Sequence, residues 1–217
     1  MIRYVGFDMD GTLADTLTDA TDAVNFGLSQ IHCPPRSEEE VQSYMGDSVY
    51  ELIRRAMAPV EDEDLLEQAK QGFDTYYEKH FCDKTHLYPG IHELCKKLTE
   101  TGIQLFVFSN KQILFVQEML QRLLPEFSFA AVLGNHENFP PKPDPQQFLL
   151  FQEREGFSSR ECVLIGDSNI DIATAHRANI YSVGVLWGYG ERKAFLKEKA
   201  DLYTDSAEEI YQWITKQ

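Results

Sequence analysis

The chain begins with a short sequence on which the interpretation of the whole protein depends, Tyr4-Val5-Gly6-Phe7-Asp8-Met9-Asp10-Gly11-Thr12. Residues 3–8 are predicted to form a short buried strand, with Asp8 at its end. A glycine follows the second aspartate, so Asp10 also fits an ordinary turn before Gly11. The sequence therefore predicts a strand and a tight loop that carries two closely spaced carboxylates.

The segment that follows, residues 16–85, has helical character. Its apolar residues recur at helical spacing, as in Val49, Leu52, Ile53, Ala56 and Met57. The sequence Ser37-Glu38-Glu39-Glu40 is typical of a capping box at the start of a helix. We therefore expect an all-helical insert of about four helices directly after the first strand.

After Tyr88-Pro89-Gly90 the pattern changes to short apolar strands that alternate with amphipathic helices, which indicates a parallel sheet covered on both faces. The predicted strands cover residues 103–108, about 129–133, 162–166 and 181–185, and the predicted helices cover 91–101, 112–123, 145–154, 169–178 and 206–215, with a shorter one at 191–198. The predicted fold is thus an α/β protein: a doubly wound, Rossmann-like parallel sheet from residues 1–15 and 86–217, with the helical segment 16–85 inserted.

Polar side chains gather at the predicted strand ends and just before the predicted helices. They are Asp8 and Asp10, then Ser109, Asn110 and Lys111, then Lys142, and finally Asp167 and Asp171. Ligands of such sheets bind beyond the carboxyl ends of the strands, so these side chains are expected to converge. Clustered carboxylates repel one another unless a hard cation holds them, and Mg²⁺ prefers oxygen ligands. The sequence therefore predicts a magnesium site.

The motif Asp8-x-Asp10-Gly11-Thr12, followed by Ser109, Lys142 and Gly166-Asp167-x-x-x-Asp171, resembles the haloacid dehalogenase superfamily, in its branch of phosphatases that form an aspartyl phosphate. The resemblance covers the whole chain in order and spacing, and it implies that residues 16–85 form a cap over the catalytic core.

The resemblance implies a role for each residue of the motif. Asp8 would attack phosphorus and become a phosphoaspartate, and Asp10 would protonate the leaving oxygen and then activate water. Mg²⁺ would be held by the carboxylates of Asp8 and Asp167 and by the backbone carbonyl of Asp10. Lys142 would neutralise charge on the nucleophile and the phosphate, although its proline-rich loop also fits simple punctuation before a helix.

The resemblance also implies that Thr12, Ser109 and the amide of Asn110 bind the substrate phosphoryl group. Ser109 and Asn110 equally fit caps of the helix that follows. Asp171 would act behind the metal ligands, on a metal-bound water or on Lys142, or else compensate a helix dipole. Lys111 has no assigned role and is expected to be solvated.

Two arginines of the insert, Arg54 and Arg55, are candidates to bind a second acidic group of the substrate, and Arg55 is the one we assign to substrate binding. The alternative for Arg55 is an ordinary helical pair with Glu51, four residues earlier.

Several branches of the superfamily are disfavoured by residues present here. Dehalogenases do not need Asp10, and phosphonatases use a cap lysine, whereas the cap loop here is Gly46-Asp47-Ser48-Val49 and no lysine precedes residue 70. β-Phosphoglucomutases carry a histidine in the region of residues 16–26 and an arginine in the cap loop, and this chain has neither. The sequence Trp187-Gly188-Tyr189-Gly190 fits an ordinary turn, and it also resembles the segment after the last core strand of phosphoglycolate phosphatases. We therefore expect a phosphatase of small metabolites; the alternatives are a pyrophosphatase or another small phosphomonoesterase, a mutase, or a regulatory binder without turnover.

The composition limits the partners. A net charge of −15 disfavours nucleic acid, because phosphate binding needs a basic face. No apolar run approaches the roughly 20 residues of a membrane span, and no signal peptide is evident. Four cysteines without metal-ligand spacing are expected to be reduced. We expect a cytoplasmic enzyme, monomer or homodimer, that acts on a small phosphorylated metabolite.

Overall fold

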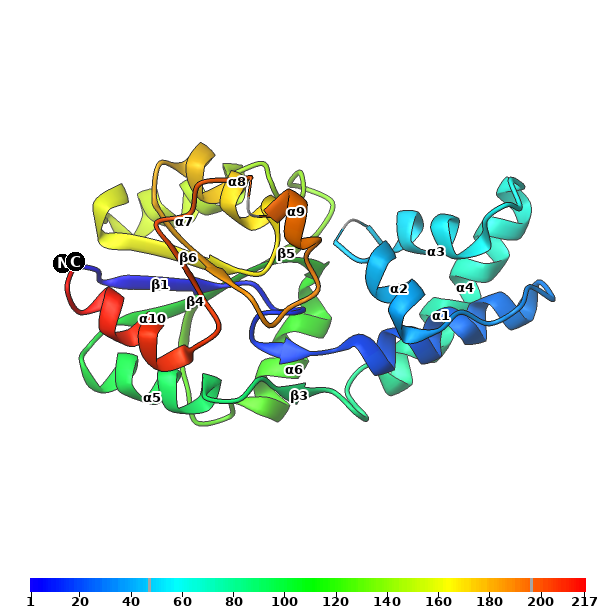
Figure 1. Cartoon of the computed structure of the whole chain (residues 1–217), viewed down its shortest axis with the longest axis horizontal. Coiled ribbons are helices and arrows are strands. Elements are labelled where there is room, and N and C mark those ends of the chain that lie inside the picture. The colour runs from blue at the N-terminus through cyan, green and yellow to red at the C-terminus, as the bar shows by residue number, and fades with distance from the viewer. Residues whose placement is uncertain (47, 196) are drawn as a thin grey trace. The chain divides into compact units, whose positions relative to one another are not determined.

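The computed structural model describes residues 1–46, 48–195 and 197–217, which form two compact units (Figure 1). One unit contains Met1–Ala14 and Leu87–Gln217, and the other contains Asp15–His86. The chain passes between the units at β2 (Ala14–Asp15) and β3 (His86–Leu87), which pair with one another. Asp47, in the predicted loop 46–49, and residue 196, in the predicted helix 191–198, lie outside the described residues.

The larger unit is built on a six-stranded sheet with the order β5-β4-β1-β6-β7-β8, in which every neighbouring pair is parallel. Its strands are β1 (Tyr4–Phe7), β4 (Gln104–Gln112), β5 (Phe129–Asn135), β6 (Cys162–Gly166), β7 (Tyr181–Val185) and β8 (Leu202–Thr204). All four residues of β1 are buried, because the strand lies in the middle of a sheet covered on both faces. The predicted α/β fold class is confirmed.

Helices cover both faces of this sheet. They are α5 (Ile91–Glu100), α6 (Ile113–Leu123), α7 (Gln146–Glu155), α8 (Asn169–Ala178), the short α9 (Arg192–Phe195) and α10 (Ala207–Ile214). Figure 1 shows α7 and α8 on one side of the sheet and α5 and α10 on the other. Under α7 and α8 the core is aromatic: Phe106 packs against Phe148 and Phe151, and Tyr4 stacks on Phe157 with ring centroids 3.9 Å apart.

The strand β4 differs from its prediction. It continues past Phe108 to Gln112, so Ser109, Asn110 and Lys111 belong to the strand rather than to a loop after it. Phe108 pairs with Leu133 and Gln112 with Asn135, so three residues of β4 lie opposite one residue of β5. This is a β-bulge, which bends the strand and redirects its side chains at the edge of the sheet.

Three strands were not predicted. β2 and β3 have two residues each, and β8 has three, of which one is fully buried. Such short segments carry too few alternating positions to give a periodic signal.

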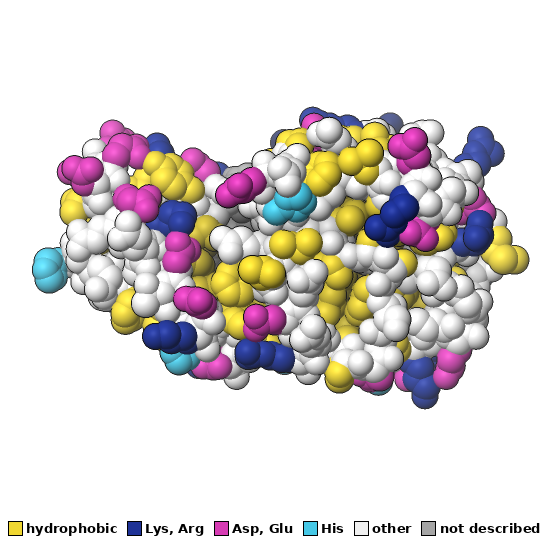
Figure 2. Space-filling model, turned by 180° about the vertical axis from the view of Figure 1, so that it is seen from behind, with side chains coloured by type: hydrophobic (Ala, Val, Ile, Leu, Met, Phe, Trp, Pro, Cys, Tyr) yellow, Lys and Arg dark blue, Asp and Glu magenta, His cyan; other side chains and the backbone are white. Residues whose placement is uncertain are grey.

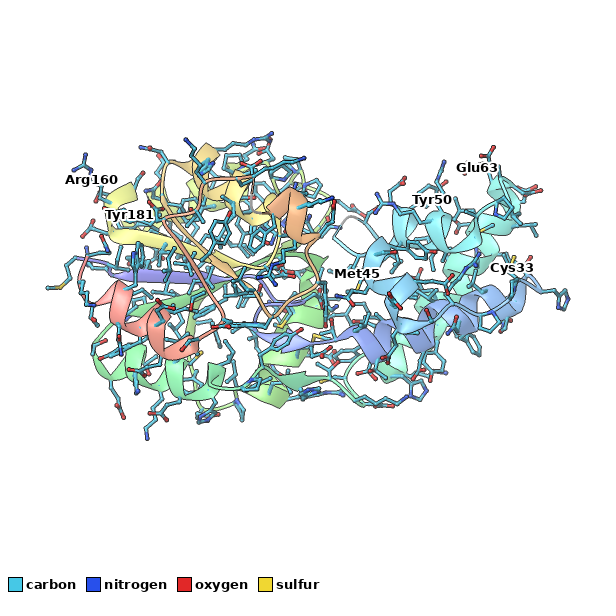
Figure 3. All side chains as sticks on the ribbon, in the orientation of Figure 1. Cys33, Met45, Tyr50, Glu63, Arg160 and Tyr181 are labelled. Atoms are coloured by element: carbon cyan, nitrogen blue, oxygen red, sulfur yellow. The ribbon has the colours of Figure 1, made fainter. Side chains whose placement is uncertain are left out.

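The smaller unit contains α1 (Leu17–Gln30), α2 (Glu38–Tyr44), α3 (Val49–Met57) and α4 (Glu63–His80). The predicted capping box at Ser37 is present at the start of α2. Of the apolar residues that predicted a helix, Leu52, Ile53, Ala56 and Met57 are buried on α3, and Val49 at its start is partly exposed. Near the start of α4, Tyr50 donates to Glu63 at 2.5 Å, and Figure 3 shows these two side chains near each other.

The surface of the molecule carries charges of both signs. Figure 2 shows acidic and basic side chains interspersed over one face. Among the described residues, none of the helices combines the length and the apolar character needed to cross a bilayer.

Candidate active site

The loop after β1 holds Asp8 by backbone contacts. The amide of Asp8 donates to the carbonyl of Ile165 on β6 at 2.9 Å, and the amide of Met9 donates to Oδ1 of Asp8 at 2.7 Å. The loop then turns back, because the amide of Gly11 donates to the carbonyl of Ala14 at 3.0 Å. Gly11 has φ +78°, and a Cβ there would lie 2.3 Å from Oδ2 of Asp167, so only glycine fits. The glycine after Asp10 thus lets the loop that follows β1 pack against Asp167 at the end of β6.

Lys142 is buried among carboxylates. Its Nζ lies 2.5 Å from Oδ1 of Asp171 and 3.0 Å from Oδ1 of Asp8, and its side chain is 2% exposed. Burial alone would lower the pKa of Lys142, but Asp171 and Asp8 outweigh it and raise that pKa above its ordinary value. The lysine is therefore a permanent cation beside Asp8.

The backbone at Lys142 is fixed by one side chain. Oδ1 of Asn110 accepts from the amide of Lys142 at 2.7 Å, and Nδ2 of Asn110 donates to the carbonyl of Lys142 at 3.2 Å. Sequence reasoning used only the backbone amide of Asn110, so this side-chain role was missed. It ties the bulge of β4 to the loop before α7.

Asp167, at the end of β6, is held by the turn after β7. Its Oδ2 accepts from the amides of Tyr189 and Gly190 at 2.6 and 3.2 Å. Its Oδ1 accepts from the hydroxyl of Thr12 at 3.2 Å. A Cβ at Gly188 would lie 2.3 Å from Cβ of Asp167, so the turn needs glycine to approach this closely. The sequence signal for this contact was the pair of glycines in residues 187–190.

Thr12 is fully buried, and the contact that the structure gives its hydroxyl is Asp167. Its carbonyl accepts from Nε1 of Trp187 at 3.2 Å. These contacts fix the first loop to the turn after β7, while the assignment of Thr12 to substrate binding stays a prediction.

Asp171, in the first turn of α8, uses its two carboxylate oxygens for different contacts. Oδ1 accepts from Lys142, and Oδ2 accepts from the amide and hydroxyl of Ser168 at 3.1 and 2.7 Å, which completes a capping box. The contact with Lys142 is among the roles expected from the sequence, while the role of Asp171 toward a metal-bound water stays a prediction.

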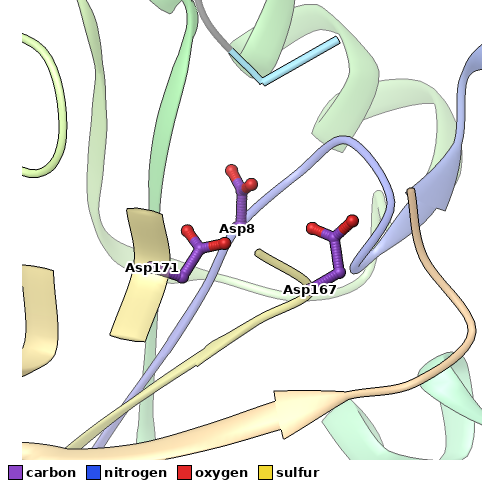
Figure 4. A group of neighbouring side chains, drawn as sticks. All are labelled: Asp8, Asp167 and Asp171. Atoms are coloured by element: carbon purple, nitrogen blue, oxygen red, sulfur yellow. The ribbon is translucent and has the colours of Figure 1, made fainter. Parts of the chain in front are cut away.

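Asp8, Asp167 and Asp171 form a cluster whose nearest oxygens all lie within 4.8 Å of one another. Figure 4 shows the three carboxylates arising from separate segments, with Asp171 pointing toward Asp8. Burial and the neighbouring acids Asp171 and Asp10 raise the pKa of Asp8 to about 6, although Lys142 opposes the shift. Burial, Asp171 and Asp8 raise the pKa of Asp167 to about 8. Carboxylates that are this costly to ionise, and that offer only oxygen, fit a hard divalent cation.

Asp10 and Lys111 form a pair at the same edge of the sheet. Nζ of Lys111 lies 2.8 Å from Oδ1 of Asp10, and the lysine side chain is 11% exposed. The expectation that Lys111 is solvated is therefore wrong, because the bulge of β4 directs it toward Asp10.

Ser109 is buried and hydrogen-bonds Asp8. The expectation that Ser109 or Asn110 caps α6 is also wrong, since α6 begins after Gln112 without a side-chain cap.

Arg55 lies on α3 in the smaller unit and donates to the carbonyl of Tyr44 at 3.0 Å. Its neighbour Arg54 contacts Glu63 at 3.2 Å and Glu51 at 3.8 Å, and it lies over the ring of Tyr50. Glu51 therefore pairs with Arg54. The role of Arg55 toward substrate stays a prediction.

Comparisons with known proteins agree with this arrangement. The family model described as "Haloacid dehalogenase-like hydrolase" matches residues 5–185. A phosphoglycolate phosphatase of Haemophilus influenzae is 32% identical over 86% of this chain and 87% of its own length, and one of Vibrio cholerae is 31% identical over 94% and 93%. The crystal structure of a predicted phosphoglycolate phosphatase from Haemophilus somnus superposes with a TM-score of 0.92 at 29% identity, and the match covers 100% of this chain and 98% of that one.

Proposed function

The chain belongs to the haloacid dehalogenase-like hydrolase family and is a phosphatase, and we propose that it hydrolyses small phosphomonoesters, phosphoglycolate foremost, with Mg²⁺ and a phosphoaspartate at Asp8. The observation that carries the proposal is the contact of Lys142 with both Asp8 and Asp171 beside the buried Asp167. A nucleophilic carboxylate, a fixed cation and a cluster of oxygen donors are the groups that phosphoryl transfer to an aspartate requires.

The charges of the site support a divalent cation. With all four acids ionised, the carboxylates of Asp8, Asp10, Asp167 and Asp171 and the ammonium groups of Lys111 and Lys142 leave an excess of two negative charges. Asp8 and Asp167 would hold Mg²⁺ through their side chains, and Asp10 through its backbone carbonyl. When bound, the ion would offset this excess and polarise the phosphoryl oxygens.

Asp8 then acts as the nucleophile. One of its oxygens attacks phosphorus, the bond from phosphorus to the leaving oxygen breaks, and protonated Asp10 gives its proton to that oxygen. A water then attacks the phosphoaspartate and gives a proton back to Asp10, and the bond to Asp8 breaks to release inorganic phosphate.

Other side chains orient the phosphoryl group. Lys142 compensates the charge that collects on Asp8 and the phosphoryl oxygens. Ser109 and the amide of Asn110 donate hydrogen bonds to those oxygens. Both come from the bulge of β4, which is fixed to the loop of Lys142 by the side chain of Asn110.

We further propose a cytoplasmic location and a small phosphorylated metabolite as the partner. The four cysteines, Cys33, Cys82, Cys95 and Cys162, are free thiols, as is usual for proteins of a reducing compartment. Cys95 and Cys162 are buried, and burial raises the pKa of Cys95 to about 12, which keeps it an inert thiol.

The test is phosphate release from a panel of phosphoglycolate, p-nitrophenyl phosphate, glucose 1-phosphate and pyrophosphate. We expect the highest kcat/KM for phosphoglycolate with Mg²⁺, and no release in excess chelator. Full activity in chelator contradicts the metal, and a preference for pyrophosphate contradicts the substrate class.

A further inference from the structure

Lys111 is a largely buried cation at the catalytic edge that the steps above do not use. It ends the bulged segment of β4, in which three residues lie opposite one residue of β5. Its Nζ lies 2.8 Å from Oδ1 of Asp10, with the two side chains 11% and 20% exposed. Lysines on a surface rarely hold one position, because the long side chain loses rotamer entropy, but a largely buried one is confined.

The chemistry of an ammonium group decides what this contact does. Lysine carries hydrogen-bond donors and no acceptor. While its Nζ donates to Oδ1 of Asp10, a proton on the Asp10 carboxyl is more stable on Oδ2, because a carbonyl oxygen accepts a hydrogen bond better than a hydroxyl oxygen does. The contact therefore favours protonation of Oδ2 and restricts the rotation of the Asp10 side chain.

We propose that Lys111 is a positioning residue for Asp10: it binds Oδ1 so that Oδ2 delivers the proton to the leaving oxygen and later receives one from water. This inference rests on the proposed function, in which Asp10 is the acid and base. Lys142 performs a different task, because it contacts Asp8 and Asp171.

The bulge supplies the reason for the placement. Ser109 and Asn110, which precede Lys111, hydrogen-bond Asp8 and the backbone of Lys142 respectively. The amide of Lys111 also donates to the hydroxyl of Ser109 at 3.3 Å, which stabilises the conformation of the bulge. Three successive residues of the β4 bulge thus contact the nucleophile Asp8, the backbone of Lys142 and the acid–base residue Asp10.

The experiment measures how much the reaction depends on the leaving group. The kcat/KM value reports the step in which the leaving group departs, and only a poor leaving group needs a proton from Asp10. The substrates are p-nitrophenyl, phenyl and ethyl phosphate, which carry no second anionic group, together with phosphoglycolate. In Lys111→Met we expect kcat/KM to fall about threefold or less for p-nitrophenyl phosphate and about 10²-fold for ethyl phosphate.

Two comparisons make the result specific. Asp10→Asn should show the same selective loss, and adding Lys111→Met to it should cost nothing further, because both changes remove one function. Lys111→Arg should recover part of the loss with ethyl phosphate. Lys97→Met is the matched control, because Lys97 pairs with Glu208 at 2.7 Å on the surface of the same unit. The kcat/KM of this variant should equal that of the wild type for every ester.

The outcomes separate this inference from the proposed function. Equal losses for all esters in Lys111→Met overturn the positioning role, and so does a loss confined to phosphoglycolate, which would make Lys111 a substrate-carboxylate contact. In both cases the wild type remains an active phosphatase. A wild type that releases phosphate from none of the esters overturns the proposed function itself.

Discussion

Replacement of Lys142 by methionine tests the electrostatics of the site apart from catalysis. Methionine is unbranched and of similar length, so the change removes the charge and leaves little cavity. The carboxylate of Asp8, which is 13% exposed, and that of the buried Asp171 then lose a cation at 3.0 and 2.5 Å. Removal of one partner from a buried ion pair costs about 3–5 kcal/mol. We expect the free energy of unfolding to fall by about this amount at pH 8 in excess chelator.

The loss should depend on pH in a direction that the structure fixes. A carboxyl whose pKa is higher in the folded chain than in the unfolded chain takes up protons on folding, so the free energy of unfolding decreases as pH rises through that range. Asp8 already has a pKa of about 6 against an ordinary value of 3.8, and Lys142 lowers it. Without the lysine, protonation of Asp8 costs less free energy than keeping it ionised beside Asp171.

The cost of that protonation sets the size of the effect. Relative to the ordinary value of 3.8, holding one carboxyl neutral costs about 1.6 kcal/mol at pH 5 and about 5.7 kcal/mol at pH 8, at 1.36 kcal/mol for each pH unit. The penalty of Lys142→Met should therefore be about 2 kcal/mol or less at pH 5.

Urea unfolding followed by tryptophan fluorescence measures this directly. Trp187 and Trp213 are the two tryptophans of the chain, and both belong to the unit that contains Lys142. Lys97→Met, which breaks an exposed pair, is the control and should unfold like the wild type at both pH values. A Lys142→Met protein as stable as the wild type at pH 8, or equally destabilised at pH 5 and pH 8, would refute the reasoning.

Two further predictions concern metal binding and substrate choice. Thr12→Val removes the hydroxyl that donates to Oδ1 of Asp167. We expect the free energy of unfolding to fall by about 1 kcal/mol and activation by Mg²⁺, measured by Mg²⁺ titration of activity, to weaken about tenfold. Unchanged activation would mean that Thr12 does not orient Asp167. Arg55→Ala should lower kcat/KM at least about tenfold for phosphoglycolate but not for p-nitrophenyl phosphate, because a charge-assisted contact is worth about 1.5–3 kcal/mol. Arg54→Ala is the matched comparison, since Arg54 is engaged with Glu63, and equal effects on both substrates would make Arg55 structural.

The fold could be predicted from the sequence where burial is two-sided. Strands such as β1 and β6 are buried along their whole length, so they appear as uninterrupted apolar runs between helical segments. The short strand β8 could not be predicted, because two of its three residues are only half buried at the edge of the sheet.

The site was predictable where chain order carries the information. Asp8 and Asp167 end neighbouring strands of a parallel sheet, which places them together whatever the details of the loops. The pairing of Lys111 with Asp10 was not predictable, because it depends on a bulge, and a lysine after a strand looks like any surface lysine. The amides of Tyr189 and Gly190 that hold Asp167 leave only an indirect signal in the sequence, the two glycines of residues 187–190.

The central claim is that Asp8 becomes phosphorylated during turnover. The most direct measurement is an acid quench of the Asp10→Asn variant during reaction with p-nitrophenyl phosphate, where loss of the base should let the phosphoenzyme accumulate. Borohydride reduction then converts an aspartyl phosphate to homoserine, which mass spectrometry locates in the chain. We expect homoserine at position 8, and neither homoserine nor phosphate release in Asp8→Asn. Homoserine at another aspartate, or phosphate release at the wild-type rate from Asp8→Asn, would contradict it.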